Sequence, residues 1–303
     1  MAIVLQESLR AVFYAPFYVA LAQDAFGADG VDIRFASAPR PGDAARGLFD
    51  GTVDVCWGGP MRVMETYQLR ADCDLVSFAE VVTRDPFLLV GRGERPQFSP
   101  ADLSTLRLAS VSEVPTPWMC LQEDVRRAGA DPALINRIAD RSMADNVAAL
   151  RAGTVDVAQL FEPFVSELLE SPEYRVWFAQ ADRGPTSYTT FYTRRPTLTA
   201  RRDELLRMVR AIARTETWVG GASATAIATT IARYFSDVPH ARLTAACARY
   251  KSLGIWGSTP IVPRAGYDRL LASLVSGGFV SPGTPFGVAV DNSLAEIVAT
   301  PPP

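Results

Sequence analysis

The sequence predicts an α/β fold made of two similar lobes. Two distant stretches carry nearly the same pattern, Gly51-Thr52-Val53-Asp54-Val55 and Gly153-Thr154-Val155-Asp156-Val157. Each pattern is typical of a helix that ends at a glycine and leads into a short β-branched strand. A duplicated open α/β unit leaves a crevice between its halves, at the carboxyl ends of the strands, where small molecules bind.

The first part of the chain alternates short apolar strands with helical segments. We expect strands at 2–5, 31–35, 53–56, 75–82 and 87–90, and helices at 17–26, before Gly51 and at 61–68. Pro16 suits the first turn of the helix that follows it. The stretch 91–100 is rich in Gly, Arg, Pro and Ser, which is typical of a connector.

The alternation then starts again. We expect strands at 106–111, 155–161, 174–178 and 187–193, a strand or turn at 134–138, and helices at 118–128, 143–151 and 163–170, with mostly helical structure after Leu198. The chain should leave the first lobe near Val90 and return near Phe191. Lobe 1 would then comprise 1–90 and 191–303, and lobe 2 would comprise 91–190. Two crossover segments of this kind form a hinge.

Composition excludes several classes of function. The chain has 30 basic and 33 acidic residues, a net charge of −3, and no basic stripe, so no nucleic-acid partner is expected. Its four cysteines have no ligand spacing, which argues against a metal site or a disulfide framework. No nucleotide-binding or hydrolase motif is present, and we expect no cofactor.

The segment from Ala11 to Ala22 is apolar and imitates a secretory signal. Glu7 precedes it and no second basic residue accompanies Arg10, so we interpret the segment as part of the fold. No run of about eighteen apolar residues occurs, and we expect no membrane insertion. The sequence as given therefore predicts a cytoplasmic location, or a periplasmic one if an export segment lies upstream.

Several stretches together resemble one family. These are 14–22, 30–33, 51–55, and 153–158 with Phe161-Glu162-Pro163. They resemble, in order, motifs of type-2 periplasmic solute-binding proteins of the nitrate/sulfonate/taurine and thiamine-pyrimidine (NMT1/THI5-like) branch, and the resemblance covers most of 3–260. It implies a two-lobed periplasmic-binding-protein-like type 2 fold with a hinge of two crossover segments. It also implies a small anionic or heteroaromatic ligand and an ABC permease as partner.

Two other functions remain open. Some relatives with this architecture are enzymes, so a lyase-like cytoplasmic enzyme is possible, such as a decarboxylase, desulfinase or pyrimidine synthase acting on a small aromatic or heterocyclic acid. A cytoplasmic metabolite sensor is the third hypothesis. His240, the single histidine, lies outside the loops expected at the crevice, and the cysteine tract and histidine of the two related enzyme patterns are absent. We expect no catalytic residue, although acid–base work by Glu113, Glu162 and a tyrosine stays open.

Candidate ligand contacts follow the strands of lobe 1. Ser8, Arg10 and Tyr14 belong to the loop after the first strand. Arg10 could bind a carboxylate or sulfonate in a bidentate manner, or lie in solvent. Pyrimidine-binding relatives tend to carry an aromatic residue where Ser8 stands, which disfavours a thiamine-type pyrimidine. The next loop holds Trp57, Gly58, Gly59 and Met61, whose backbone N–H groups could meet the ligand, while Trp57 could be core.

In lobe 2 the equivalent loop contains Ser112, Glu113, Thr116 and Trp118. Its hydroxyls could bind the ligand or cap the helix, and Trp118 could stack on a ring. Glu162 could bind an amine or serve as a helix N-cap. Arg84 and Tyr188 face the crevice if the layout implied by the resemblance holds.

Overall fold

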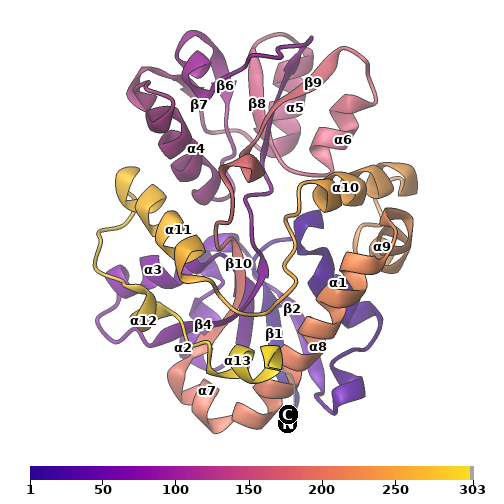
Figure 1. Cartoon of the computed structure of the whole chain (residues 1–303), viewed down its shortest axis with the longest axis vertical. Coiled ribbons are helices and arrows are strands. Elements are labelled where there is room, and N and C mark those ends of the chain that lie inside the picture. Colours follow the sequence, from indigo (N-terminus) through magenta and orange to yellow (C-terminus); the bar gives the residue numbers. More distant parts are fainter. Residues whose placement is uncertain (301–303) are drawn as a thin grey trace.

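The structure is a computed structural model that describes residues 1–300, and it has two lobes (Figure 1). Within residues 1–300, each lobe is built on one five-stranded sheet. The strand order is β2-β1-β3-β10-β4 in lobe 1 and β7-β6-β8-β5-β9 in lobe 2. The first three strands of each order are parallel, and the fourth runs antiparallel to both its neighbours. The predicted fold class is confirmed.

The elements of the lobes follow one another as the sequence predicts. Lobe 1 contains β1 (Ile3–Glu7), α1 (Ala15–Ala22), β2 (Ile33–Ser37), α2 (Arg46–Asp50), β3 (Val55–Gly58), α3 (Pro60–Leu69), β4 (Leu75–Val82) and β10 (Thr189–Arg194). Lobe 2 contains β5 (Leu88–Arg92), β6 (Arg107–Ala109), α4 (Thr116–Arg127), β7 (Asn136–Ile138), α5 (Met143–Arg151), β8 (Val157–Leu160), α6 (Phe164–Leu169) and β9 (Tyr174–Ala179).

The remaining helices follow β10 and cover lobe 1. They are α7 (Arg195–Ala200), α8 (Arg202–Gly221), α9 (Ala224–Ile231), α10 (His240–Ser252), α11 (Arg264–Ser276), α12 (Phe286–Ala289) and α13 (Ser293–Ala299). Helix α8 packs on α1 and α13, whereas α10 and α11 reach across to α6 and α4 of lobe 2 (Figure 1). Within residues 1–300, no helix combines the length and apolar character that a membrane crossing requires.

The duplicated motif forms the same turn twice. Gly51 and Gly153 have φ angles of 77° and 69°, in the left-handed region that glycine adopts without strain. The aspartate that follows each turn accepts a hydrogen bond from the backbone of the neighbouring parallel strand. Asp54 Oδ2 accepts from the Val4 N–H, and Asp156 Oδ2 accepts from the Arg107 N–H, both at 2.8 Å. The motif therefore ties β3 to β1 in lobe 1 and β8 to β6 in lobe 2.

Most differences from the prediction concern the ends of elements. The strand at 75–82 and the helix at 143–151 have the predicted bounds. The helix expected at 17–26 occupies 15–22, because Asp24 takes a left-handed conformation with φ 51° and ends the helical path. The next strand accordingly starts at Ile33 rather than at Val31.

The chain changes lobes slightly earlier than the sequence suggested. Strand β5 already pairs with β8 and β9, so the first crossover is 83–87 and the second is 180–188. The connector at 91–100 consequently lies within lobe 2. The crossovers run side by side, since the N–H groups of Thr186 and Tyr188 donate to the carbonyl groups of Thr83 and Val82 at 2.7 and 2.9 Å.

A buried ionic network holds the crossovers to lobe 2. Arg183 donates to Asp85 Oδ2 at 2.9 Å and to Asp124 Oδ1 of α4 at 2.8 Å, and its side chain is only 2% exposed. Gln180 also donates to Asp85, at 3.0 Å. Burial raises the pKa of Asp85 to about 6, although the Arg183 charge acts in the opposite direction. The hinge is thus anchored at its lobe 2 end.

Candidate functional site

A cavity lies between the two lobes, beside the crossovers. It contains about 480 Å³ of atom-free space, part of it open to solvent. Its lining comes from both lobes and from the crossovers. The lining residues are Ser8, Leu9, Phe13, Tyr14, Pro41, Ala44, Gly58, Gly59, Met61, Arg62, Phe87, Val114, Thr116, Tyr188 and Tyr192.

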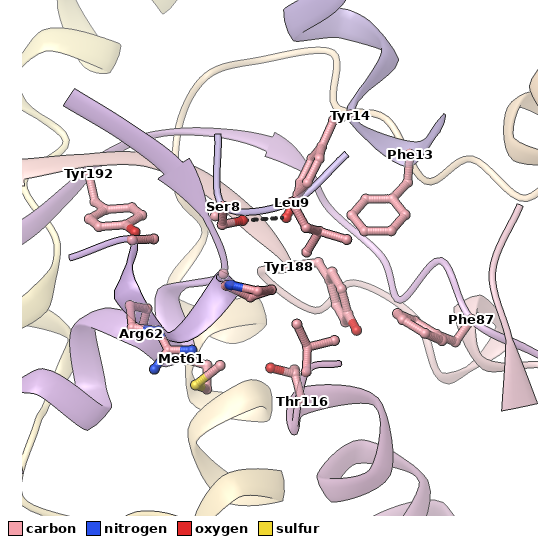
Figure 2. A pocket seen from close by; sticks show the side chains of 15 residues that line it. Ser8, Leu9, Phe13, Tyr14, Met61, Arg62, Phe87, Thr116, Tyr188 and Tyr192 are labelled. Carbon is pink, nitrogen blue, oxygen red and sulfur yellow. Dashed lines mark hydrogen bonds between the residues drawn. The ribbon is translucent and has the colours of Figure 1, made fainter. Parts of the chain in front are cut away.

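One side of the cavity is aromatic. Phe13 packs edge-on against Tyr14 with ring centroids 4.4 Å apart, and lies 6.3 Å from Phe87 and 6.4 Å from Tyr188 (Figure 2). Phe87 and Tyr188 come from the two crossovers, whereas Phe13 precedes α1. These rings present both faces and edges, so they suit a flat, largely apolar ligand body.

Hydroxyl groups line the cavity between the rings. Ser8 Oγ and the Tyr14 hydroxyl share a hydrogen bond of 3.2 Å (Figure 2). The hydroxyls of Tyr188 and Tyr192 are buried and have no partner in the described part of the chain. Burial raises the pKa of Tyr14 to about 12, so this phenol stays protonated at neutral pH. The unpartnered hydroxyls are available to a ligand that accepts hydrogen bonds.

Three helices begin at the cavity. Tyr14 is the N-cap of α1, Gly59 is the N-cap of α3, and Thr116 is the first residue of α4. Helix N-termini carry partial positive charge and free N–H groups, which favour an anionic or accepting group nearby. The cavity thus combines apolar walls with an electrostatic preference for an acceptor.

Two glycines allow the walls to approach closely. A Cβ atom on Gly58 would lie 3.3 Å from Ser8 Oγ, and one on Gly59 would lie 3.3 Å from the Tyr188 carbonyl oxygen. Both distances are shorter than ordinary carbon–oxygen contacts. Glycine at these positions therefore lets β3 and the start of α3 lie directly against the first loop and the second crossover.

Arg62 is the cationic side chain of the lining within residues 1–300. It forms an ion pair with Glu65 one helical turn later in α3, and their side chains are 15% and 22% exposed. The arginine charge is consequently offset before any ligand enters. An anionic ligand would compete with Glu65 or share Arg62 with it.

The structure brings half of the predicted contacts to the cavity. Ser8, Tyr14, Gly58, Gly59, Met61, Thr116 and Tyr188 all belong to the lining. Arg10 lies elsewhere, because its guanidinium binds the buried Glu7 carboxylate at 2.6 Å. Glu7 also accepts from Tyr18 and Ser37, both at 2.6 Å, and thus organises this loop from below.

Both predicted tryptophans are part of the packing of the lobes. Trp57 is fully buried and lies between Phe17 and Phe35, with ring centroids 4.6 and 5.3 Å away and nearly parallel planes. Trp118 lies under the Arg137 guanidinium, 4.2 Å from the ring centroid, and belongs to the core of lobe 2. Trp57 thus lies in the core of lobe 1, which is the alternative position that the sequence had left open for it.

The other predicted contacts stabilise loops and the first turns of helices. Ser112 donates to the Arg141 carbonyl, Glu113 accepts from the Met143 N–H at 2.9 Å, and Arg84 donates to the Ala181 carbonyl at 3.2 Å. Glu162 Oε2 accepts from the Ser166 N–H at 2.8 Å, in the first turn of α6. Its other oxygen accepts from Arg249 of α10 at 2.7 Å, so this carboxylate caps a helix and joins the lobes.

The sequence-based prediction missed Leu9, Phe13, Pro41, Ala44, Arg62, Phe87, Val114 and Tyr192. Phe87 had a usable signal, because it follows Asp85-Pro86 in the turn that enters the hinge. Phe13 and Leu9 lie within a loop that was identified, between residues that were named. Tyr192 gave no signal, since it sits inside β10 where a register irregularity between Phe191 and Tyr192 disturbs the simple alternation of faces.

The polar side chains that line the cavity are hydroxyls of serine, threonine and tyrosine together with the Arg62 guanidinium. Within the described residues its lining includes no carboxylate, histidine, lysine or cysteine side chain. Cys56 lies behind the wall, its thiol donates to the Ala44 carbonyl at 3.2 Å, and burial raises its pKa to about 12. Such a thiol is a poor nucleophile.

Comparison with known proteins relates this chain to a family and to a named relative. The family model described as NMT1/THI5 like matches residues 13–220. YtlA of Bacillus subtilis (strain 168), which is named as a binding protein, is 24% identical over 297 residues, covering 97% of this chain and 89% of YtlA.

Two solved structures show how widely the fold is used. The periplasmic aliphatic sulphonate binding protein SsuA from Escherichia coli superimposes with a TM-score of 0.76 and 15% identity, covering 92% of this chain and 94% of SsuA. The desulfurization enzyme DSZB has a TM-score of 0.66 and 13% identity, with 98% of each chain covered. At these identities the likeness establishes the fold, which serves both binding and catalysis.

Proposed function

The chain belongs to the NMT1/THI5-like family, and we propose that it binds a small organic solute between its lobes as the substrate-binding component of an ABC-type uptake system. The observation that carries the proposal is the cavity itself. It lies between duplicated lobes, and its Tyr188 and Tyr192 hydroxyls lack protein partners in the described chain. SsuA and the binding protein YtlA support the same role.

The ligand that fits this cavity has a flat apolar body and one accepting or anionic end. Phe13, Phe87 and Tyr188 would contact the body. The Tyr192 hydroxyl, the Ser8–Tyr14 pair and the three helix N-termini would bind the accepting end. Because Glu65 offsets Arg62, we expect a weakly charged or singly charged head to bind better than a multiply charged one.

The seven predicted contacts in the lining, namely Ser8, Tyr14, Gly58, Gly59, Met61, Thr116 and Tyr188, form the proposed site together with Arg62 and Tyr192. A permease is the proposed protein partner, and a location outside the cytoplasmic membrane follows from that role. Cell fractionation of the native strain with an antibody against the chain would test the location.

Calorimetry and thermal shift against a panel of aromatic and aliphatic sulfonates, carboxylates and pyrimidines would test the binding function. We expect micromolar or tighter binding of at least one aromatic acid or heteroaromatic compound, with the compound recovered unchanged. Conversion of a panel compound by the purified protein would instead support the lyase-like enzyme. Absence of any thermal shift across the panel would contradict the proposed ligand class.

A further inference from the structure

Two buried glutamates lie beneath the hinge, apart from the cavity. Glu80 is near the end of β4 and is 2% exposed, and Glu216 lies on α8, which packs on β4, and is 1% exposed. Glu80 Oε1 and both carboxyl oxygens of Glu216 have no hydrogen-bond partner in the described chain. Neither carboxyl group pairs with a cation within residues 1–300. Two unpaired negative charges at these depths would be very unfavourable.

The surroundings of the pair supply no compensating positive charge. The segment 254–262 closes over it and contains no titratable side chain, and a Cβ atom on Gly257 would lie 2.9 Å from Glu216 Oε1. Ser187 Oγ is buried beside Glu80 without a hydrogen bond of normal geometry. Lys251 of α10 is occupied by the Val219 and Gly220 carbonyl groups, at 2.8 and 2.9 Å.

On the other elements that pack on β4 or α8, charged side chains are absent, exposed or paired elsewhere; on α3, Arg62 pairs with Glu65. Helices α1 and α12 carry no charged side chain, and the glutamate of α13, Glu296, is exposed. In β10, Arg194 binds Asp74 at 2.8 Å and Tyr192 faces Cys56 on the other side of the sheet. On α8 itself, Arg214 pairs with Asp29 at 2.8 Å.

We propose that at least one of the two carboxyl groups, that of Glu80 or that of Glu216, is protonated in the folded protein, and that losing this proton loosens the crossovers beside the cavity. A carboxylic acid group supplies the donor that the three oxygens lack, whereas the described residues offer no group of three metal-binding side chains. Burial raises the pKa of Glu80 to about 8, and burial followed by repulsion from Glu80 raises the pKa of Glu216 well above its ordinary value. The negative charge of an ionised Glu80 would thus make ionisation of Glu216 still less favourable.

The position of the pair explains why its charge would be felt at the hinge. Three backbone hydrogen bonds join β4 and the first crossover to the covering segment: Glu80 N–H to the Pro260 carbonyl, Gly257 N–H to Val81, and Thr83 N–H to Ile255, at 2.8–2.9 Å. Ser187 directly precedes Tyr188 of the cavity. Repulsion between two carboxylates would therefore strain the segments that place Tyr188.

Infrared spectroscopy tests the buried protonated carboxyl group without reference to any ligand. The difference spectrum between the native chain and the Glu80→Gln/Glu216→Gln double variant at pH 6.5 should contain the carbonyl band of a protonated carboxylic acid. The same difference taken with Glu94→Gln, a glutamate whose side chain is 77% exposed, should lack it. Absence of the band would overturn the proposal. A melting temperature that then rises with calcium or magnesium and falls with a chelator would point to a bound cation instead.

Thermal unfolding gives the second readout. Between pH 6 and pH 9 the native chain should lose more than about 5 °C in melting temperature, and the double variant should lose much less because its amides do not ionise. Equal losses in both would contradict the proposal. If the double variant does not fold, Glu80→Gln alone, whose amide can donate to Glu216, should show the reduced loss.

The link to the cavity rests on the proposed function and has its own measurement. Affinity for a solute identified in the panel should fall several-fold from pH 6 to pH 9 in the native chain and stay nearly constant in the double variant. A failure of this readout alone, with the infrared band present, would refute the coupling to the cavity. A panel without any binder would instead refute the proposed function and leave the first two readouts decisive for the proton.

Discussion

Tyr188 shows at the scale of one residue how the cavity is prepared for a ligand. Its ring packs beside Phe13 and Phe87, yet its hydroxyl has no partner within residues 1–300. A buried hydroxyl without a hydrogen bond costs free energy in the ligand-free protein. A ligand that accepts from it recovers that cost on binding.

We therefore predict that Tyr188→Phe weakens solute binding by roughly three- to tenfold while leaving the free energy of unfolding unchanged or slightly higher. Calorimetry and urea titration measure the two quantities. Tyr67→Phe is the matched control, because that hydroxyl donates to the Leu75 carbonyl away from the cavity, and it should leave affinity unchanged. Equal affinity of the Tyr188 variant and the native chain would remove Tyr188 from the site.

Single residues also show where sequence reasoning reaches its limit. Loops that follow strands located Ser8, Thr116 and the two glycines, because the carboxyl ends of strands open toward the crevice. Arg10 lies in such a loop as well, but the buried Glu7 three residues earlier binds it. The partner of a charged side chain depends on the fold, and the sequence gives only its neighbours along the chain.

At the scale of elements, the duplicated turn allows a quantitative prediction about stability. Asp54 accepts a backbone hydrogen bond from β1, and Asp156 accepts one from β6. Replacing either with alanine should lower the free energy of unfolding by about 1 kcal/mol, measured by urea titration with spectroscopic probes. Asp140→Ala serves as a surface control, and equal stability of all three variants would show that the motif contributes nothing.

The Asp156 contribution should also depend on pH. The hydrogen bond from the Arg107 side chain is the main cause that lowers the pKa of Asp156 below its ordinary value of 3.8. A lowered pKa in the folded state means that the stabilisation is present above that value and is lost as the pH falls through the lowered pKa. The stability difference between the native chain and Asp156→Asn should therefore shrink on acidification below about pH 4.

The buried ionic network at the hinge joins the two crossovers to helix α4 of lobe 2. Arg183 neutralises Asp85 and Asp124 in a buried setting. Arg183→Met would leave two buried carboxyl groups without their cation and should cost about 3 kcal/mol or more. Arg127→Met, which removes an exposed ion pair of the same helix α4, should cost less than about 1 kcal/mol. Similar values for both variants would contradict the role of the network.

The order of elements was predictable, whereas their ends and the hinge position were not. Apolar periodicity and glycine turns identify helices and strands, but a crossover is defined by which sheet a strand joins. The residues of β5 would suit a strand of either sheet. Its pairing with β8 and β9 places it in lobe 2. Such pairing is a long-range property that local patterns do not encode.

At the scale of the whole molecule, contacts far from the cavity also join the two lobes. Arg242 of α10 binds Glu170 of lobe 2 at 2.8 Å, and Ser276 of α11 donates to Glu123 at 2.8 Å on the other side. Arg242→Met should favour the open form, lower solute affinity by roughly two- to fivefold, and increase the radius of gyration of the ligand-free protein in X-ray scattering.

Arg92→Met provides the control for this experiment. Arg92 pairs with Glu173 within lobe 2, so its loss should change neither the scattering nor the affinity. An unchanged radius for the Arg242 variant, with reduced affinity, would mean that the arginine acts on the ligand by a route other than closure.

The place of β10 in its sheet bears on how the protein is made. This strand lies between β3 and β4, and β4 has β10 as its partner among the strands of lobe 1. A ribosome completes every strand of lobe 2 before it reaches β10, so lobe 2 can fold on the nascent chain while lobe 1 waits with β4 unpaired. Biosynthesis would thus finish the inserted half first, and an exposed, apolar β4 would be the segment for which a chaperone matters most.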